Sequence, residues 1–261
     1  MICPLQTIVS FLNDELKLGE IQDYPNAFNG LQIENAGEIS SIATAVDASE
    51  RAMREAVDHG ADLLIVHHGL YWSGLRPVTG AWKRKLQLAM DHNLAVYSVH
   101  LPLDIHPTLG NNVLLAKACG ISITGGALPS KGHDMGIRGT FPGTAAELAA
   151  AVAQAVNAPV ESYLHLHLPH DTPGDIIVCS GGAGGDLEEA VLEGAQTYIT
   201  GEGAHWNIPM AEELGVNLIF GGHYATETFG VRALGRLLSE RFGLPCSDLD
   251  IPPSRYSAPI A

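Results

Sequence analysis

The stretch ADLLIVHHG, at residues 61–69, indicates how this chain folds. Residues 63–66 form a short apolar run, which is typical of a strand that is buried on both faces. The run ends in His67, His68 and Gly69. In an open α/β sheet, ligands bind just beyond the carboxyl ends of the strands. The two histidines are therefore candidate ligand-binding residues.

Similar apolar runs recur along the chain, and most of them are followed by a helical pattern. The runs are rich in Ile, Val and Leu and lie at residues 42–46, 63–66, 94–99, 176–179, 198–200 and 218–220. One of the intervening helices is expected from a capping serine, Ser49, to Gly60, which can close it in the left-handed conformation. Strands that alternate with helices predict an α/β fold with mostly parallel or mixed sheets flanked by helices.

Glycine and proline are frequent in residues 121–174, which predicts a short middle insertion between two interlinked α/β halves. We therefore expect a first half at residues 1–120, the insertion at 121–174, and a second half at 175–261 that packs against the first. Within the insertion, Thr144 and Glu147 have the spacing of a helix capping box.

The adjacent histidines at the end of residues 63–66 suggest metal chemistry. One metal ion rarely binds two imidazoles at this spacing, whereas two neighbouring ions can take one each. The alternative is a buried histidine that is hydrogen-bonded to backbone. For a single histidine that alternative is favoured, and for the pair His67 and His68 at a strand end we favour ligands.

A second strand ends in VHLPLD, at residues 99–104. Asp104 could supply a hard oxygen ligand, or it could cap the next helix, and the sequence does not favour either role. His100 could bind the metal itself, form a hydrogen bond to a residue that binds the metal, or act as a general base.

A third strand ends in FGGHYATE, at residues 220–227. A helix is expected to begin at His223 or just after it and to continue through Leu238. His223 and Glu227 are four residues apart, so both lie on one face of that helix and can converge on a metal cluster. The alternative is an ordinary surface pair, which the two glycines disfavour because they remove bulk beside the histidine.

Together the three strand ends offer nitrogen and oxygen donors that suit Zn, Fe, Mn or Ni better than Ca. Two ions about 3.5–4 Å apart can activate a shared water, so a dinuclear hydrolytic centre is the main hypothesis. The glycine-rich residues 180–186 match no phosphate-binding motif, and we interpret them as a tight turn. Glu202 and His205 follow another strand and are weaker candidates.

Composition excludes several classes of protein. The net charge of −15 argues against an extended nucleic-acid surface. The four cysteines are far apart, which argues against a disulfide framework and fits a reducing cytoplasm. Neither a signal peptide nor a membrane span is expected from the sequence. Charged residues make up only 16% of the chain, against roughly 25% in typical domains, a hint of buried subunit surface.

The sequence resembles the GTP cyclohydrolase type 2-like family, also called the NIF-three-like dinuclear metal-centre family. The resemblance covers nearly the whole chain in the right order and rests on the segments at residues 29–32, 46–49, 67–69, 100–104, 198–202 and 222–227. It implies an α/β fold, a toroidal homohexamer built as a trimer of dimers, and two divalent ions per subunit, such as Zn, Fe or Mn. Where some relatives have Gly-Asp, this chain has Gly201-Glu202, which leaves the role of Glu202 open.

Carried over by motif, the resemblance implies that His68 and Asp104 bind one ion, that His67 and His223 bind the other, and that Glu227 bridges them. The implied activity is hydrolysis, in which metal-activated water attacks a C–N bond of a purine nucleotide and His100 shuttles a proton. The alternatives are a non-enzymatic metal-binding, metal-trafficking or adaptor protein, and a phosphoesterase-type hydrolase.

Overall fold

The computed structural model describes residues 1–157 and 166–253 and divides the chain into two compact units. Unit 1 comprises Met1–Leu103 and Val231–Ala261, and unit 2 comprises Asp104–Gly230. This division differs from the three expected segments, because the end of the chain belongs to the first unit. Residues 158–165 of the expected insertion lie outside the described residues.

Unit 1 contains a mixed five-stranded sheet, with strand order β13-β4-β5-β6-β2. The strands are β2 (Gly30–Ile33), β4 (Ile42–Asp47), β5 (Leu63–His68), β6 (Ala95–Ser98) and β13 (Cys246–Asp248). Neighbouring strands from β13 to β6 are parallel, and β2 is antiparallel to β6. The short strands β1 (Cys3–Pro4) and β3 (Glu38–Ile39) pair separately. The pairing of β13 with β4 is what assigns the end of the chain to unit 1.

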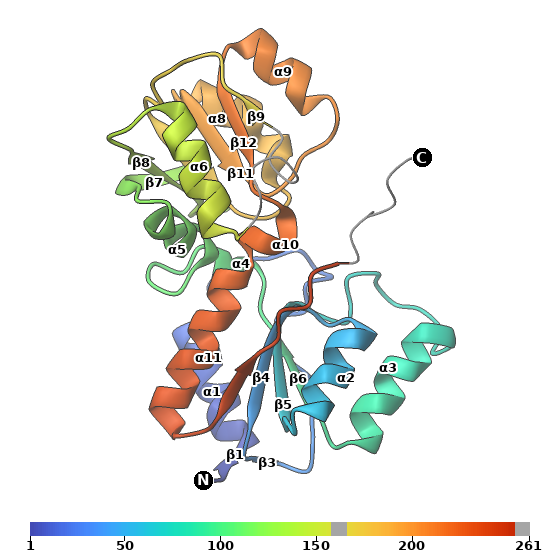
Figure 1. Ribbon diagram of the computed structural model, residues 1–261. Coiled ribbons are helices and arrows are strands. Elements are labelled where there is room, and N and C mark those ends of the chain that lie inside the picture. The colour runs from blue at the N-terminus through green and yellow to red at the C-terminus, as the bar shows by residue number, and fades with distance from the viewer. Residues whose placement is uncertain (158–165, 254–261) are drawn as a thin grey trace. The chain divides into compact units, whose positions relative to one another are not determined.

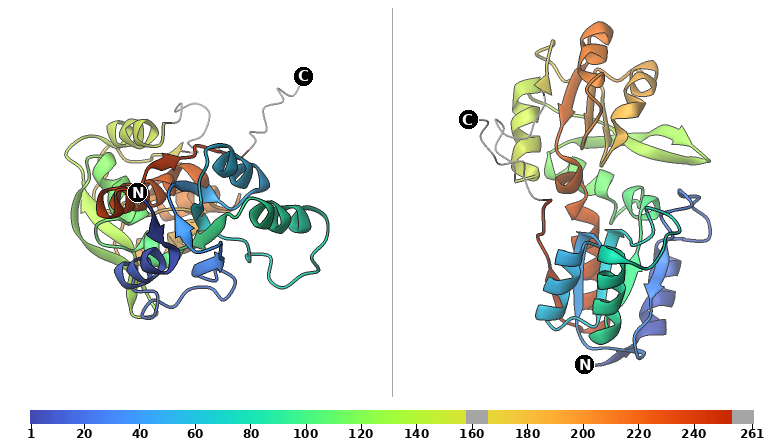
Figure 2. Two further views of the ribbon diagram at one scale, coloured as in Figure 1. Left: turned by 90° about the horizontal axis from the view of Figure 1, so that it is seen from below. Right: turned by 90° about the vertical axis from the view of Figure 1, so that its right-hand side faces the viewer.

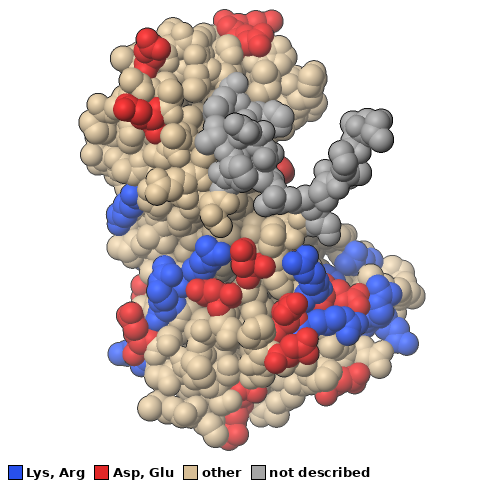
Figure 3. Space-filling view, viewed as in Figure 1, with Lys and Arg blue, Asp and Glu red and all other residues tan. Residues whose placement is uncertain are grey.

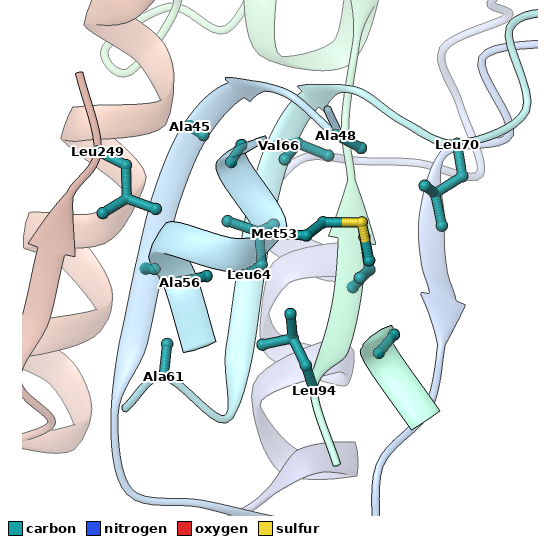
Figure 4. Packing of buried hydrophobic residues seen from close by; sticks show 14 of the residues in the cluster. Ala45, Ala48, Met53, Ala56, Ala61, Leu64, Val66, Leu70, Leu94 and Leu249 are labelled. Carbon is teal, nitrogen blue, oxygen red and sulfur yellow. The ribbon is translucent and has the colours of Figure 1, made fainter. Parts of the chain in front are cut away.

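Helices cover both faces of this sheet (Figure 1). Helices α2 (Glu50–Asp58) and α3 (Gly80–Asp91) lie on one face, and α1 (Leu5–Glu15) and α11 (Thr228–Phe242) lie on the other. Side chains alternate along a strand, so Leu64 and Val66 of β5 pack with Met53 under α2 (Figure 4). By the same alternation His67 points to the opposite face from His68.

Unit 2 contains a mixed six-stranded sheet, with strand order β7-β8-β10-β11-β12-β9. The strands are β7 (Ser122–Ser130), β8 (His133–Thr140), β9 (Leu166–His167), β10 (Ile176–Cys179), β11 (Thr197–Thr200) and β12 (Asn217–Phe220). Strands β10, β11 and β12 are parallel, and the other pairings are antiparallel. The two long strands of the expected insertion, β7 and β8, extend the sheet that contains β10, β11 and β12.

The helices of unit 2 also lie on both faces of its sheet, as Figure 2 shows. The helical elements are α5 (Asn111–Ala118), α6 (Ala145–Ala155), the short 3-10 helix η1 (Ala183–Asp186), α8 (Leu187–Leu192), α9 (Asn207–Leu214) and α10 (His223–Thr226). Helices α5 and α6 pack on one face with residues such as Val178 and Ile199. Helices α8 and α9 pack on the opposite face with Tyr198 and Leu218.

The expected α/β class and the six expected strands are confirmed. The capping box of Thr144 and Glu147 is present, and Ser49 caps α2 by accepting a hydrogen bond from the Ala52 amide at 3.1 Å. One helix differs from expectation. Helix α10 stops at Thr226, whose hydroxyl donates to the carbonyl oxygens of the preceding turn, and α11 begins two residues later.

Charge is distributed unevenly over the chain. Unit 2 contains three of the 14 Lys and Arg residues, and the other 11 belong to unit 1. Figure 3 shows part of this basic group over α2 and α3. Across residues 1–157 and 166–253, every helix is too short or too polar to cross a lipid bilayer.

Candidate metal centre

The three histidines predicted at strand ends in unit 1 form one cluster. His68 ends β5, and His100 lies between β6 and helix α4 (Leu101–Asp104). One ring nitrogen from each of His67, His68 and His100 lies within 4.8 Å of the others. Strands β5 and β6 are parallel neighbours, so their carboxyl ends meet at one edge of the sheet. The three rings therefore lie close enough to take part in one metal centre.

Hydrogen bonds orient the first two of these imidazoles. The Nδ1 atom of His67 lies 2.9 Å from the carbonyl oxygen of Val99, and Nδ1 of His68 lies 2.9 Å from a carboxylate oxygen of Asp47. A carbonyl or carboxylate oxygen only accepts, so each Nδ1 carries the proton and donates it. The lone pair is then on Nε2 in both rings. This arrangement is common among histidines that bind metals.

His100 is oriented in the same way by Asp23, whose side chain is only 6% exposed. The His100 Nδ1 atom lies 2.9 Å from Oδ1 of Asp23, and Oδ2 accepts from the Leu101 amide at 2.9 Å and from Asn29 at 2.8 Å. Burial by itself raises the pKa of Asp23, but the hydrogen bonds from His100, Asn29 and the Tyr24 amide lower it below its usual range. Asp23 is therefore a buried carboxylate that is stabilised in its charged form.

In unit 2, His223 and Glu227 meet as their spacing predicts. The Nε2 atom of His223 lies 3.2 Å from Oε2 of Glu227, and Nδ1 lies 2.8 Å from Oε1 of Glu202. Burial lowers the pKa of His223, but the two carboxylates outweigh it and raise that pKa to about 9. In the metal-free protein the ring is thus an imidazolium between two carboxylates. The direct contact of Glu202 with His223 makes it a partner of that ring.

The glycine-rich residues 180–186 lie beside these two side chains. A Cβ atom added to Gly181 would collide with the Glu227 carboxylate, and one added to Gly182 would lie 3.4 Å from the His223 ring. The glycines that make room here are therefore Gly181 and Gly182. The sequence suggested that Gly221 and Gly222 make room beside the histidine. Cβ atoms added to these two glycines would instead meet Thr226 and Ala225.

Asp104 is the last residue of α4 and is buried. Its Oδ1 atom accepts hydrogen bonds from Asn111 at 2.8 Å and from the Ser180 hydroxyl at 3.2 Å. It does not cap the next helix, since the N-cap residue of α5 is Gly110. One carboxylate oxygen of Asp104 lies within 4.8 Å of one of Glu227, and both residues are buried, so two carboxylates of unit 2 lie close together.

The donors of each unit are of kinds that bind divalent transition metals. Unit 1 offers imidazoles, and unit 2 offers an imidazole and carboxylates, which suit Zn, Fe or Mn better than Ca. Sequence reasoning missed the groups that hold these donors: Asp23, Asp47, Asn111 and Ser180. Asp23, Asp47 and Ser180 contact these donors across 21 or more residues, and although Asp47 lies in the motif at residues 46–49, that motif does not reveal its contact with His68. His205, a weaker candidate, is exposed.

Comparison with known proteins identifies the family. Residues 4–252 match the family model described as Duf34/NIF3 (NGG1p interacting factor 3). The chain is 36% identical over 250 residues to a protein of Deinococcus radiodurans named GTP cyclohydrolase 1 type 2 homolog, covering 94% of this chain and 92% of that protein. A protein of the same name from Pyrococcus abyssi is 38% identical over 248 residues, covering 95% of this chain and 98% of that protein.

Two solved structures have the same fold. The structure titled protein ybgI, unknown function, has a TM-score of 0.88 and 32% identity, and covers 97% of this chain and 100% of its own. The structure of TTHA1606 from Thermus thermophilus has a TM-score of 0.84 and 32% identity, with the same coverage. The motif resemblance is thus confirmed, and the chain belongs to the Duf34/NIF3 family.

Proposed function

We propose that this chain binds two divalent metal ions through donors from both units. His68 and Asp104 would hold one ion, His67 and His223 would hold the other, and Glu227 would be shared between them. The hydrogen bonds at Nδ1 of the unit 1 imidazoles carry the proposal, because a histidine that binds metal through one ring nitrogen almost always donates its other N–H to a carboxylate or a carbonyl oxygen. The assignment to individual ions follows from the motif resemblance.

Unit 2 supports the proposal through its charge. The carboxylates of Asp104 and Glu227, which are buried and have oxygens within 4.8 Å of each other, repel each other, and a divalent cation would offset that repulsion. The carboxylates of Glu227 and Glu202 raise the pKa of His223, so they favour a positive charge at this ring. A metal ion at Nε2 would supply that charge in place of the proton.

We further propose that the centre hydrolyses a C–N bond of a purine nucleotide. Divalent ions at such a site lower the pKa of water to about 7 and polarise a substrate oxygen. His100 accepts a proton from the attacking water at Nε2 and returns it to the leaving nitrogen, while Asp23 holds its Nδ1 proton. The net reaction adds one water across the bond. The name borne by the relatives, GTP cyclohydrolase 1 type 2 homolog, is consistent with this substrate class.

The test uses purified protein loaded separately with Zn, Fe or Mn and incubated with GTP. Mass spectrometry should detect a product heavier by one water molecule, and His100→Ala should slow its formation about 10²–10⁴-fold. Metal binding without conversion of GTP would refute the hydrolase proposal and favour the non-enzymatic metal-binding or trafficking alternative. Release of inorganic phosphate without ring opening would favour a phosphoesterase.

The resemblance also leads us to propose a homohexamer, a trimer of dimers. The low proportion of charged residues, 16%, is consistent with buried subunit surface. Light scattering coupled to size-exclusion chromatography should give six times the chain mass of 27.6 kDa, and a monomer mass would contradict the hexamer without bearing on the metal ligands.

A further inference from the structure

Unit 1 exposes two aromatic rings on residues 23–29, the loop whose Asp23 and Asn29 side chains contact His100. Tyr24 is 58% exposed and Phe28 is 61% exposed, although both rings are large. The Tyr24 ring centroid lies 6.0 Å from that of His100 and 6.4 Å from that of Trp72. The Trp72 ring in turn lies 4.7 Å from His100 in an edge-to-face arrangement. Scattered surface aromatics are common, but Tyr24 and Trp72 are grouped around one histidine, and Phe28 is exposed on the same loop as Tyr24.

Hydrogen bonds fix the two loops that carry these rings, residues 23–29 and 69–74. The Gln32 side chain donates to the Phe28 carbonyl at 3.0 Å and accepts from the Leu70 amide at 2.7 Å. Asn26 donates to the Trp72 carbonyl at 3.3 Å. The rings are therefore presented by connected loops, and little ordering is needed when a ligand contacts them.

The backbone at Phe28 is strained. Its φ angle is +48°, in the left-handed region that bulky residues rarely adopt. Such a conformation costs free energy and persists where the surroundings hold it, often at ligand-binding sites. Here Gln32 binds the Phe28 carbonyl, and the ring lies 5.1 Å from Tyr71. Despite its contact with Tyr71, Phe28 remains 61% exposed in this strained conformation.

We propose that Tyr24 and Phe28 form a platform that binds the planar heteroaromatic ring of the substrate, such as a purine base, next to His100. This inference rests on the proposed function, because it names the part of the substrate that unit 1 recognises. Aromatic side chains stack on any base, since every base has a π face. The platform therefore selects a planar ring over a sugar phosphate that lacks one.

The test compares guanosine monophosphate with ribose 5-phosphate, which have the phosphate and ribose in common and differ in the base. Dissociation constants are measured by NMR titration of the metal-free full-length protein, in which metal-dependent turnover cannot occur. Guanosine monophosphate should bind about tenfold more tightly. Tyr24→Leu and Phe28→Leu should each remove most of that preference, whereas Tyr24→Phe and Phe28→Tyr should retain it.

Met90→Ala is the matched control, because Met90 is 70% exposed in the same unit and outside the platform. An equal affinity of the wild type for both ligands, or an unchanged preference in both leucine variants, overturns the proposal. A change in oligomeric mass in the leucine variants with no change in preference also overturns it, because the rings then pack against a second copy. If the base preference persists but metal-loaded protein converts no GTP, only the hydrolase proposal fails.

Discussion

Replacing Asp23 by Asn should change the proton position on His100 while the fold persists. The carboxylate accepts four hydrogen bonds, from the Tyr24 amide at 2.6 Å, His100 at 2.9 Å, the Leu101 amide at 2.9 Å and Asn29 at 2.8 Å. An amide has one acceptor oxygen. If that oxygen keeps Leu101 and Asn29, the NH₂ group faces His100, which must then move its proton from Nδ1 to Nε2 to accept a hydrogen bond.

The cost in stability follows from these four bonds. The Asp23→Asn variant keeps two acceptor contacts and reverses the third, so it loses the charge assistance and one bond to a backbone amide. We expect a loss of about 1–3 kcal/mol in the free energy of unfolding. The folded-state pKa of Asp23 is lowered, so its contribution is present above the unfolded value of about 3.9. The difference between wild type and variant should therefore vanish as the pH falls through the folded pKa.

The assay is long-range ¹H–¹⁵N NMR of the imidazoles, which distinguishes the two tautomers. The wild type should show His100 protonated at Nδ1 and Asp23→Asn should show it protonated at Nε2, with turnover reduced as strongly as in His100→Ala. Asp62→Asn is the control, because Asp62 also accepts several hydrogen bonds, from Ser40 and Ser41, away from the histidines. If His100 is still protonated at Nδ1 in Asp23→Asn, then Asp23 does not determine the tautomer of His100.

Three further predictions concern other parts of the chain. Gly181→Ala should reduce bound metal measured by elemental analysis, because φ is +70° and the new Cβ displaces the Glu227 carboxylate, whereas Gly182→Ala should retain the metal. Thr144→Ala should lower the free energy of unfolding by about 1 kcal/mol in denaturant titrations, and an unchanged midpoint would argue against the α6 capping box. Cys119, whose pKa burial raises to about 12, should resist iodoacetamide at pH 8 in the native protein, and rapid labelling found by mass spectrometry would contradict its burial.

Much of the fold could be predicted because its strands are continuous apolar runs. Residues 63–66, for example, are all fully buried in β5, and buried parallel strands need no alternation of polar and apolar residues. The histidine and carboxylate candidates could be found for a related reason. Ligand-binding residues follow the carboxyl ends of parallel strands, so the end of each apolar run marked a candidate position.

The rest depends on contacts between distant parts of the sequence. Strand β13 has the sequence Cys-Ser-Asp and carries no apolar pattern, yet it pairs with β4 and returns the end of the chain to unit 1. Asp23 meets His100 from a loop 77 residues earlier. The role of Gly181 depends on its approach to Glu227, which no local motif reports. Such pairings are set by tertiary packing, and a single sequence does not encode them locally.

The central claim is that this chain binds two divalent ions through histidines and carboxylates of both units. The most direct measurement is elemental analysis of the purified protein after reconstitution and removal of excess metal. We expect about two metal ions per chain in the wild type and a lower metal content in both His67→Ala and Glu227→Ala. A wild type that retains no metal, or an unchanged metal content in both variants, would contradict it.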